Sequence, residues 1–268
     1  MLRRPAVAGR FYPAEPEKLT ASIREFLEPP QERIHALGVV VPHAGYMYSG
    51  HVAGAVYARV ELPQRNIVLC PNHTGLGTPL SIMKSGAWQT PLGDMQIDAE
   101  LCEALMTADP YLEDDASAHQ FEHALEVQLP FMQHLGGAPV RFVPITIGTS
   151  SLDRLLELGR AISQVIREIK NDTLIIASSD MNHYESDAIT RVKDRKAIDQ
   201  ILAMDPQGLY DVVRRENISM CGYGPAVAML TAAKQLGATR VELVKYATSG
   251  DVSLDFDHVV GYAGMIVV

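Results

Sequence analysis

The sequence predicts an α/β fold in which a largely buried sheet is layered between helices. Short apolar runs rich in β-branched residues alternate along the chain with longer amphipathic segments, and these runs are continuously apolar. A chain of 268 residues that is 47% hydrophobic is long enough to bury a sizeable core. No repeat, low-complexity tract or Gly/Ser linker divides the chain, so we expect a single domain over residues 1–268.

Two sequence patterns predict the elements: apolar, β-branched runs indicate strands, and apolar residues three and four positions apart indicate helices. An amphipathic segment covers residues 17–27, and Pro29 and Pro30 separate it from the first predicted strand. Apolar, β-branched runs predict strands at residues 36–41, 66–70, 141–147, 173–177, 241–246 and 259–268. Apolar residues three and four positions apart predict helices at residues 98–107, 122–135, 151–170, 187–204, 206–216 and 224–236. Pro144 predicts an edge position or a bulge for its strand.

The composition excludes several classes of partner and location. A net charge of −9 without a basic block argues against nucleic acid or a polybasic membrane patch. Apolar runs fall well short of the roughly 20 residues that a membrane-spanning helix needs, and no apolar segment follows Arg3 and Arg4 as in a secretory signal. Three cysteines are an odd and sparse set, typical of a reducing compartment. We therefore expect a cytoplasmic protein.

Reactive side chains follow three of the predicted strands. His43 comes shortly after the run 36–41, His73 follows the next strand, and Asp180 and His183 follow residues 173–177. Cys221 lies in the loop that enters a later helix. In open α/β sheets ligands bind in the crevice outside the carboxyl ends of the strands, so these side chains are candidates for one site.

Coordination chemistry gives a reason to group them. Two imidazoles and one anionic group leave open positions on a metal, as in the two-histidine-one-carboxylate iron(II) sites. A thiolate in the third place is softer and favours iron, copper(I) or zinc. A histidine that does not ligate could move protons near neutral pH, with Asp180 orienting it. The alternative is a set of capping or hydrogen-bonded loop histidines, with Cys221 a small buried residue like Cys70 and Cys102.

A competing motif lies between these segments. His119, Glu122 and His123 fit the pattern H-x-x-E-H, which on a helix places both histidines on one face with Glu122 as a base for a zinc hydrolase. Asp115 and Ser117 just upstream indicate a helix start, which puts His119 in the first turn or before it. Glu122 and His123 are also candidates to face the crevice.

Motifs spread over most of the chain resemble the Memo family, in a bacterial or archaeal form. The matching segments are residues 8–13, 41–46, 71–73, 122–130, 178–180 with His183, and 221–222. The resemblance implies a fold similar to the class III extradiol ring-cleaving dioxygenases, which use non-haem iron(II) at the end of a mixed sheet. It also implies iron or copper binding, redox activity, and association with a radical-SAM protein in prokaryotes.

The same resemblance implies roles for individual residues. His43, His73 and Cys221 match the family's metal ligands, and the cysteine in place of a carboxylate is where Memo proteins depart from true dioxygenases. That departure argues against ring cleavage.

Further positions match the surroundings of the metal. Asp180 and His183 match vestibule residues, with His183 in the place of the dioxygenase acid/base histidine. His123 matches a histidine that lines the substrate pocket in those enzymes.

Three functions are therefore to be separated. The leading hypothesis is a redox-active protein that holds iron(II) or copper(I) at His43, His73 and Cys221. The second is a binding module in which the crevice takes a peptide or small ligand between aromatic walls supplied by Phe11, Tyr46, Tyr48, Tyr184 and Tyr223. The third is the zinc hydrolase built on His119, Glu122 and His123.

Overall fold

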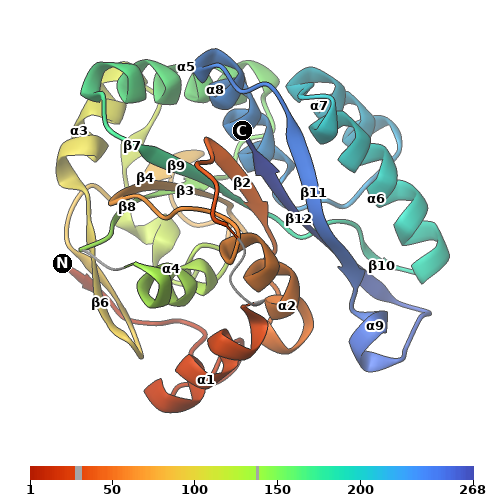
Figure 1. Cartoon of the computed structure of the whole chain (residues 1–268). Coiled ribbons are helices and arrows are strands. Elements are labelled where there is room, and N and C mark those ends of the chain that lie inside the picture. The colour runs from red at the N-terminus through yellow and green to blue at the C-terminus, as the bar shows by residue number, and fades with distance from the viewer. Residues whose placement is uncertain (28–31, 137–138) are drawn as a thin grey trace.

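Helices cover both faces of a central sheet in the computed structural model, which describes residues 1–27, 32–136 and 139–268 (Figure 1). One face is covered by α1 (Pro16–Phe26), α2 (Tyr46–Tyr57) and α4 (Leu129–Leu135). The other is covered by α3 (Ala99–Ala108), α5 (Leu152–Ile169), α6 (Asp187–Leu202), α7 (Pro206–Arg215) and α8 (Tyr223–Leu236). The predicted layered α/β class is confirmed. Pro29 and Pro30 lie outside the described residues.

Within the described residues, twelve strands form one mixed sheet. Its order is β1 (Leu2–Arg3), β5 (Ala87–Thr90), β6 (Gly93–Ile97), β8 (Arg141–Ile147), β3 (Arg65–Pro71), β9 (Thr173–Ser178), β2 (Gly38–Val41), β12 (Val259–Val267) and β10 (His183–Glu185). Off this path, β12 also pairs with β11 (Val241–Thr248), and β8 pairs with β4 (Leu80–Ile82), which in turn pairs with β7 (Glu113–Asp114). A short helix, α9 (Gly250–Ser253), connects β11 to β12.

The four central strands are parallel and end at one edge of the sheet. β8 pairs with β3, β3 with β9, and β9 with β2, all in parallel register. Their residues are almost all buried, which explains why these strands are continuously apolar rather than alternating. The loops that follow β2, β3 and β9 therefore emerge side by side.

Several elements differ from the sequence prediction. Helix α2 was not predicted, because it is buried over most of its surface and shows no polar face to give an amphipathic period. The hairpin of β5 and β6 was also missed. The helix predicted at 122–135 is wrong in its first part, where only a 3₁₀ turn at Glu126–Gln128 leads into α4. Side chains bond to backbone groups that a helix would use: the Arg3 guanidinium donates to the Glu122 carbonyl, and the Glu122 carboxylate accepts the N–H of Ala124.

Pro144 occupies a gap in strand pairing rather than an edge. On one side it lies opposite Val68 of β3. On the other side β6 pairs with β8 only as far as Phe142, and β4 begins to pair at Ile145. Since no strand residue of the described part of the chain faces Pro144 on this side, its missing N–H does not interrupt a ladder, and the strand can lie inside the sheet.

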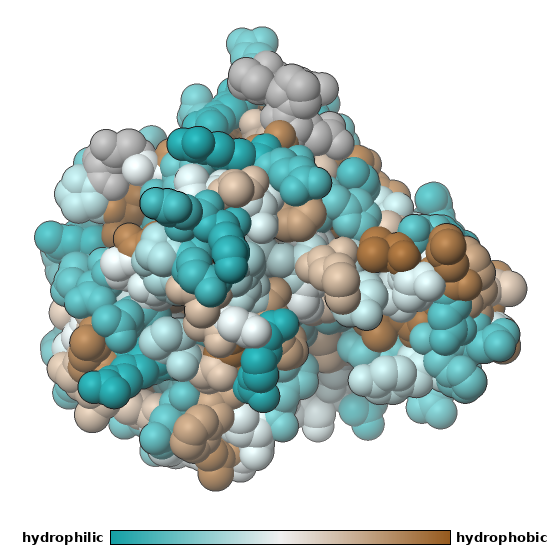
Figure 2. All heavy atoms as spheres, turned by 90° about the horizontal axis from the view of Figure 1, so that it is seen from below, coloured by the Kyte–Doolittle hydropathy of each residue, from teal (hydrophilic) through white to brown (hydrophobic). Residues whose placement is uncertain are grey.

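The surface mixes polar and apolar residues. Figure 2 shows brown residues gathered at the corner where α6, α9 and β10 lie in Figure 1. Five large apolar side chains of this region are exposed, namely Ile189, Val192, Val252, Leu254 and Phe256. None of the helices in the described residues has the length and apolar character needed to cross a bilayer.

Two glycines of α2 allow α1 to approach closely. A Cβ built on Gly54 would lie 2.2 Å from the backbone oxygen of Phe26, whereas one built on Gly50 would meet the Phe26 ring at 2.6 Å. A backbone cannot move aside as readily as a ring can. The packing of α1 on α2 therefore requires glycine most strictly at position 54.

Gly54→Ala is expected to lower the free energy of unfolding by about 2–3 kcal/mol, because the added methyl group overpacks the contact with α1. Gly50→Ala makes the same chemical change in the same helix and should cost about 1 kcal/mol or less, since the Phe26 ring can shift. Urea unfolding measures both. Stabilisation of both variants by about 0.5–1 kcal/mol, the helix propensity gain of alanine, would contradict the packing argument.

Candidate metal centre

Four histidines from separate loops line one cavity of about 600 Å³. His43 follows β2, His73 follows β3, and His183 begins β10 after the loop from β9. His123 comes from the irregular segment before α4. The remaining lining residues are Phe11, Ala44, Gly45, Asp180, Tyr184, Ser219, Cys221 and Val260. The sequence-predicted site residues thus lie together at the carboxyl edge of the parallel strands.

His43 is fixed through its Nδ1 atom. Nδ1 lies 3.0 Å from the hydroxyl oxygen of Ser178, and that hydroxyl already donates its single proton to the carbonyl of Ala124 at 2.6 Å. Gln128 also donates to the Ser178 oxygen. The network therefore assigns the proton to His43 Nδ1, which leaves a lone pair on Nε2. This Nε2 lies 3.2 Å from the sulfur of Cys221.

His73 is fixed by the buried carboxylate of Glu122. Its Nδ1 lies 2.9 Å from Oε1 and its backbone N–H donates to Oε2 at 2.6 Å, while the N–H of Ala124 donates to Oε1. Burial alone would raise the pKa of Glu122, but the hydrogen bond and charge of His73 lower it to about 2. The ionised carboxylate accepts the Nδ1 proton of His73, so Nε2 is the nitrogen left for a ligand. Nδ1 of His123 lies 3.4 Å from the same Oε1.

The three imidazoles form a compact cluster. His43, His73 and His123 place one nitrogen each within 4.8 Å of one another. Burial lowers the pKa of His43 well below 6.5 and lowers that of His123. For His73 burial also acts downward, but the hydrogen bond and charge of Glu122 outweigh it and raise the pKa. Imidazoles whose Nδ1 faces a carboxylate or a hydroxyl and whose Nε2 is left for a ligand are the donor arrangement that transition metals use. Because its pKa is raised, His73 would release a proton when a metal binds.

Cys221 and Asp180 complete the polar wall of the cavity. The Cys221 sulfur approaches both the His43 ring and, at 3.7 Å, the carbonyl of Asp180. Burial raises the pKa of this thiol well above its ordinary value, so without a cation beside it the thiol keeps its proton. Asp180 accepts the backbone N–H groups of His43 and Ala44 and so holds the β2 loop against the β9 loop.

His183 is positioned by a different network. Its backbone N–H donates to the hydroxyl of Ser219 at 2.7 Å, and its Nδ1 lies 3.0 Å from the Ser219 carbonyl. The Asn182 side chain accepts from both the N–H and the hydroxyl of Ser219. The Asn182 N–H in turn donates to the buried carboxylate of Asp194 on α6, which Tyr246 also contacts.

The family resemblance implies His43, His73 and Cys221 as metal ligands. In the structure His43 and His73 form a close cluster with His123, and the Cys221 sulfur lies 3.2 Å from His43 Nε2, so the choice of third ligand stays a prediction. The sequence predicts Glu122 as a hydrolase base or as a residue facing the crevice, and in the structure it is the hydrogen-bond partner of His73. Ser219 carried no signal beyond its place two residues before Cys221.

The H-x-x-E-H motif predicts a helix with His119 and His123 on one face, and this helix does not form. A 3₁₀ helix at Ala116–His119 ends before Glu122, so His119 and His123 do not follow one another on a helix. Asp115 does cap this turn, as the helix-start signal predicted. His119 is fully buried against Trp88, with Nδ1 on the Thr146 hydroxyl, and does not line the cavity. The geometric basis for a two-histidine zinc hydrolase is therefore absent.

Two of the five aromatic side chains predicted to line the crevice reach the cavity. Phe11 and Tyr184 line it, and the Phe11 ring packs on His123 with centroids 4.7 Å apart. Tyr46 is buried and donates to the carbonyl of Val127, while Tyr48 and Tyr223 lie outside the cavity. Cys70 and Cys102 are buried in the core, as predicted.

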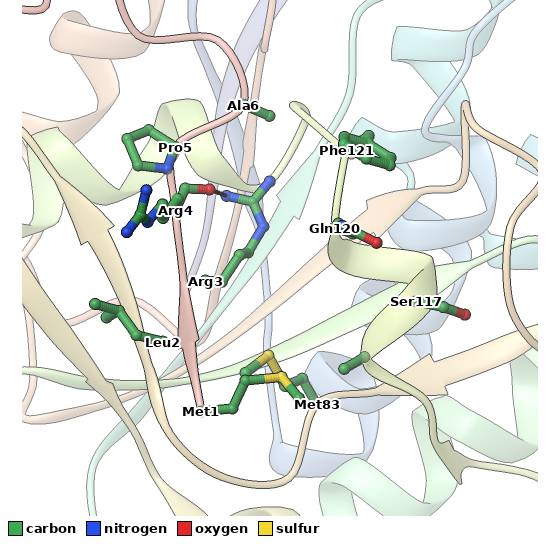
Figure 3. A pocket seen from close by; sticks show the side chains of 11 residues that line it. Met1, Leu2, Arg3, Arg4, Pro5, Ala6, Met83, Ser117, Gln120 and Phe121 are labelled. Carbon is green, nitrogen blue, oxygen red and sulfur yellow. Dashed lines mark hydrogen bonds between the residues drawn. The ribbon is translucent and has the colours of Figure 1, made fainter.

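A second cavity, of about 550 Å³, lies beside the N-terminal strand (Figure 3). The Arg3 side chain extends there from β1 toward the segment that carries Gln120 and Phe121. Its guanidinium donates to the Glu126 carboxylate at 2.7 Å, and to the carbonyls of His119 and Glu122. None of the sequence-predicted ligands lines this cavity. Arg3 thereby fixes the segment that brings His123 to the first cavity and Glu122 to His73.

The fold and site define a layered α/β protein with an imidazole cluster at the ends of its parallel strands. The family model described as Memo-like protein matches residues 3–266, so the chain belongs to the Memo family. It is 46% identical over 279 residues to a MEMO1 family protein of Methanopyrus kandleri, covering 99% of both chains. It is also 46% identical to one of Pyrobaculum arsenaticum, over 99% of this chain and 98% of that one, and 44% identical to one of Methanosarcina mazei, over 99% of each.

Glu122→Gln is expected to lower the free energy of unfolding by about 2–4 kcal/mol, because an amide has one acceptor oxygen for a site with three donors. Glu157→Gln, at a surface pair with Arg154, is the matched control and should change stability by no more than about 0.5 kcal/mol. Nitrogen-15 NMR of the His73 ring should show the proton on Nδ1 in the wild type and lose that preference in Glu122→Gln. Equal stability of both variants would contradict this account.

Asp194 predicts a pH dependence of stability. Burial raises its pKa from 3.8 to about 7, so between these pH values the folded protein holds a proton that the unfolded chain has released. Stability therefore falls as pH rises through this window, by about 3 kcal/mol for this group. Asp194→Asn should remove that slope in urea unfolding at pH 4.5–7.5, whereas Asp199→Asn, at an exposed pair on the same helix, should keep it. An unchanged slope in Asp194→Asn would contradict the prediction.

Proposed function

We propose that this Memo-family protein binds iron(II) or copper(I) at the imidazole cluster and serves as a redox protein in the cytoplasm. The observation that carries the proposal is the convergence of His43, His73 and His123 within 4.8 Å. These residues come from three loops far apart in the sequence, so only the fold brings them together. Each is held by a hydrogen bond or a close carboxylate contact at Nδ1.

The donor set argues for iron or copper. Imidazole nitrogens suit iron, copper and zinc, and a thiolate added to them shifts preference toward softer ions. Cys221 is placed to join the set, since its sulfur lies 3.2 Å from His43 Nε2. A bound iron or copper ion would supply one-electron chemistry, which zinc does not.

The other residues of the cavity would handle protons and bind the substrate. His183 has its Nδ1 on the Ser219 carbonyl, so Nε2 is the atom that takes a proton from a bound ligand. Asp180 holds the His43 loop in place through two backbone N–H groups. Phe11 and Tyr184 provide apolar surface for a small molecule or peptide side chain.

Anaerobic titration of the metal-free full-length protein with iron(II) or copper(I), followed by calorimetry, tests the proposal. One ion should bind per chain, and His43→Ala or His73→Ala should weaken binding by more than about 100-fold, because each removes a ligand rather than a supporting group. Comparing Cys221→Ser with His123→Ala shows which of these two residues is the third metal ligand. The variant with the larger loss identifies the ligand.

His134→Ala, which removes a histidine of α4 outside the cavity, is the control and should bind as the wild type does. Absence of saturable binding, or wild-type affinity in His43→Ala, would overturn the proposed metal centre. If the protein bound a peptide or small ligand equally well with and without metal, this result would instead favour the ligand-binding module. Tight zinc binding with no affinity for iron or copper would remove the redox role.

A further inference from the structure

The mouth of the histidine cavity carries an exposed aromatic side chain on a disfavoured backbone. Tyr184 lines the cavity but remains 74% exposed, and its φ is +60°. This left-handed conformation is sterically unfavourable for residues with a Cβ atom, and more so for bulky ones. Burial of the ring does not offset the cost, because the ring is largely in solvent. Such a residue is found mainly where function requires it.

A β-bulge produces this conformation. His183 of β10 lies opposite Val260 of β12, and Glu185 lies opposite the adjacent residue Val259, so Tyr184 is the extra residue between them. Both flanking residues are held firmly, His183 by Ser219, and Glu185 by Lys193 and Asn182. The bulge therefore places Tyr184 at the mouth of the cavity.

The cavity is lined by both polar and apolar groups. The polar ones are the histidine cluster, Asp180, Ser219 and Cys221. The apolar ones are Phe11, whose ring packs on His123, and Tyr184 and Val260, which lie on the paired strands β10 and β12. A ligand that fits both has a polar group at the histidines and a flat apolar part beside the aromatic rings.

We infer that Tyr184 is a specificity-determining residue of this cavity, held by the β10 bulge to contact the flat apolar part of a ligand whose polar end lies at the histidine cluster. This inference rests on the proposed function, since the polar end is taken to reach the metal. The inference adds that the Tyr184 ring at the mouth of the cavity selects the ligand. It also adds that the unfavourable backbone conformation of Tyr184 lowers the stability of the fold.

Two probes that differ only by a ring test the contact. Benzohydroxamate and acetohydroxamate share one metal-binding group, and only the first carries a phenyl ring. We expect the iron(II)-loaded wild type to bind benzohydroxamate about 10-fold more tightly, in line with one aromatic contact. Tyr184→Asn and Tyr184→Gly should reduce this ratio to below about threefold, whereas Tyr184→Phe, which keeps the ring, should retain it.

Thermal unfolding tests whether the conformation is costly. Tyr184→Gly should raise the Tm by about 2–4 °C, because glycine adopts positive φ without strain. Lys170→Gly is the matched control: it also replaces a residue with positive φ (51°), but at the C-terminus of α5 away from the cavity. It should raise the Tm similarly and leave the probe ratio unchanged.

The outcomes separate the inference from the proposed function. Titration with iron(II) alone must give wild-type affinity in all Tyr184 variants, and no binding in the wild type would count against the metal centre only. In that case the probe pair is compared on metal-free protein by NMR line broadening, where the ring preference and its loss in Tyr184→Asn are still expected. A probe ratio that is the same in the wild type and Tyr184→Asn, or the absence of ring preference in the wild type, overturns the inference.

Discussion

A buried guanidinium determines where two of the site residues lie. Arg3 is only 6% exposed, and a charge removed from water needs partners in the protein. The Glu126 carboxylate and two carbonyls of the segment between β7 and α4 supply them. Glu126 also accepts the N–H groups of Ala6 and Val7 and the hydroxyl of Tyr12. The first strand and this irregular segment therefore hold each other in place, and the segment carries His123 to the cavity and Glu122 to its contact with His73.

The sequence predicted the part of the site that depends on strand ends. His43, His73 and Asp180 follow continuously apolar runs, and parallel strands of one register end together. It did not predict the pairing of Glu122 with His73, because the conformation of residue 122 depends on Arg3, over a hundred positions away. Helix α2 was missed for a related reason: a helix buried on most sides has no polar face to mark its period.

Three chemically different acceptors achieve the same result at the site. A serine hydroxyl, a carboxylate and a backbone carbonyl take the Nδ1 positions of His43, His73 and His183. In each case Nδ1 is occupied by the protein, which leaves Nε2 for a ligand. The nitrogen that each ring offers to a ligand is thus chosen by its own hydrogen bond rather than by a metal, and the orientation of the rings is in place before any ion binds.

The position of β9 has a consequence for how the chain folds during synthesis. β2 and β3 leave the ribosome early, yet they are not neighbours: β9, made a hundred residues later, lies between them. The two strands cannot be joined until residues 173–178 have emerged, and the other edge of β2 waits for β12 at residues 259–267, so apolar edges stay open for most of translation. Non-local parallel pairing of this kind is slow and exposes hydrophobic edges to other chains. A nascent chain of this protein would therefore depend on protection, by a chaperone or by the ribosome surface, until its central strand is inserted.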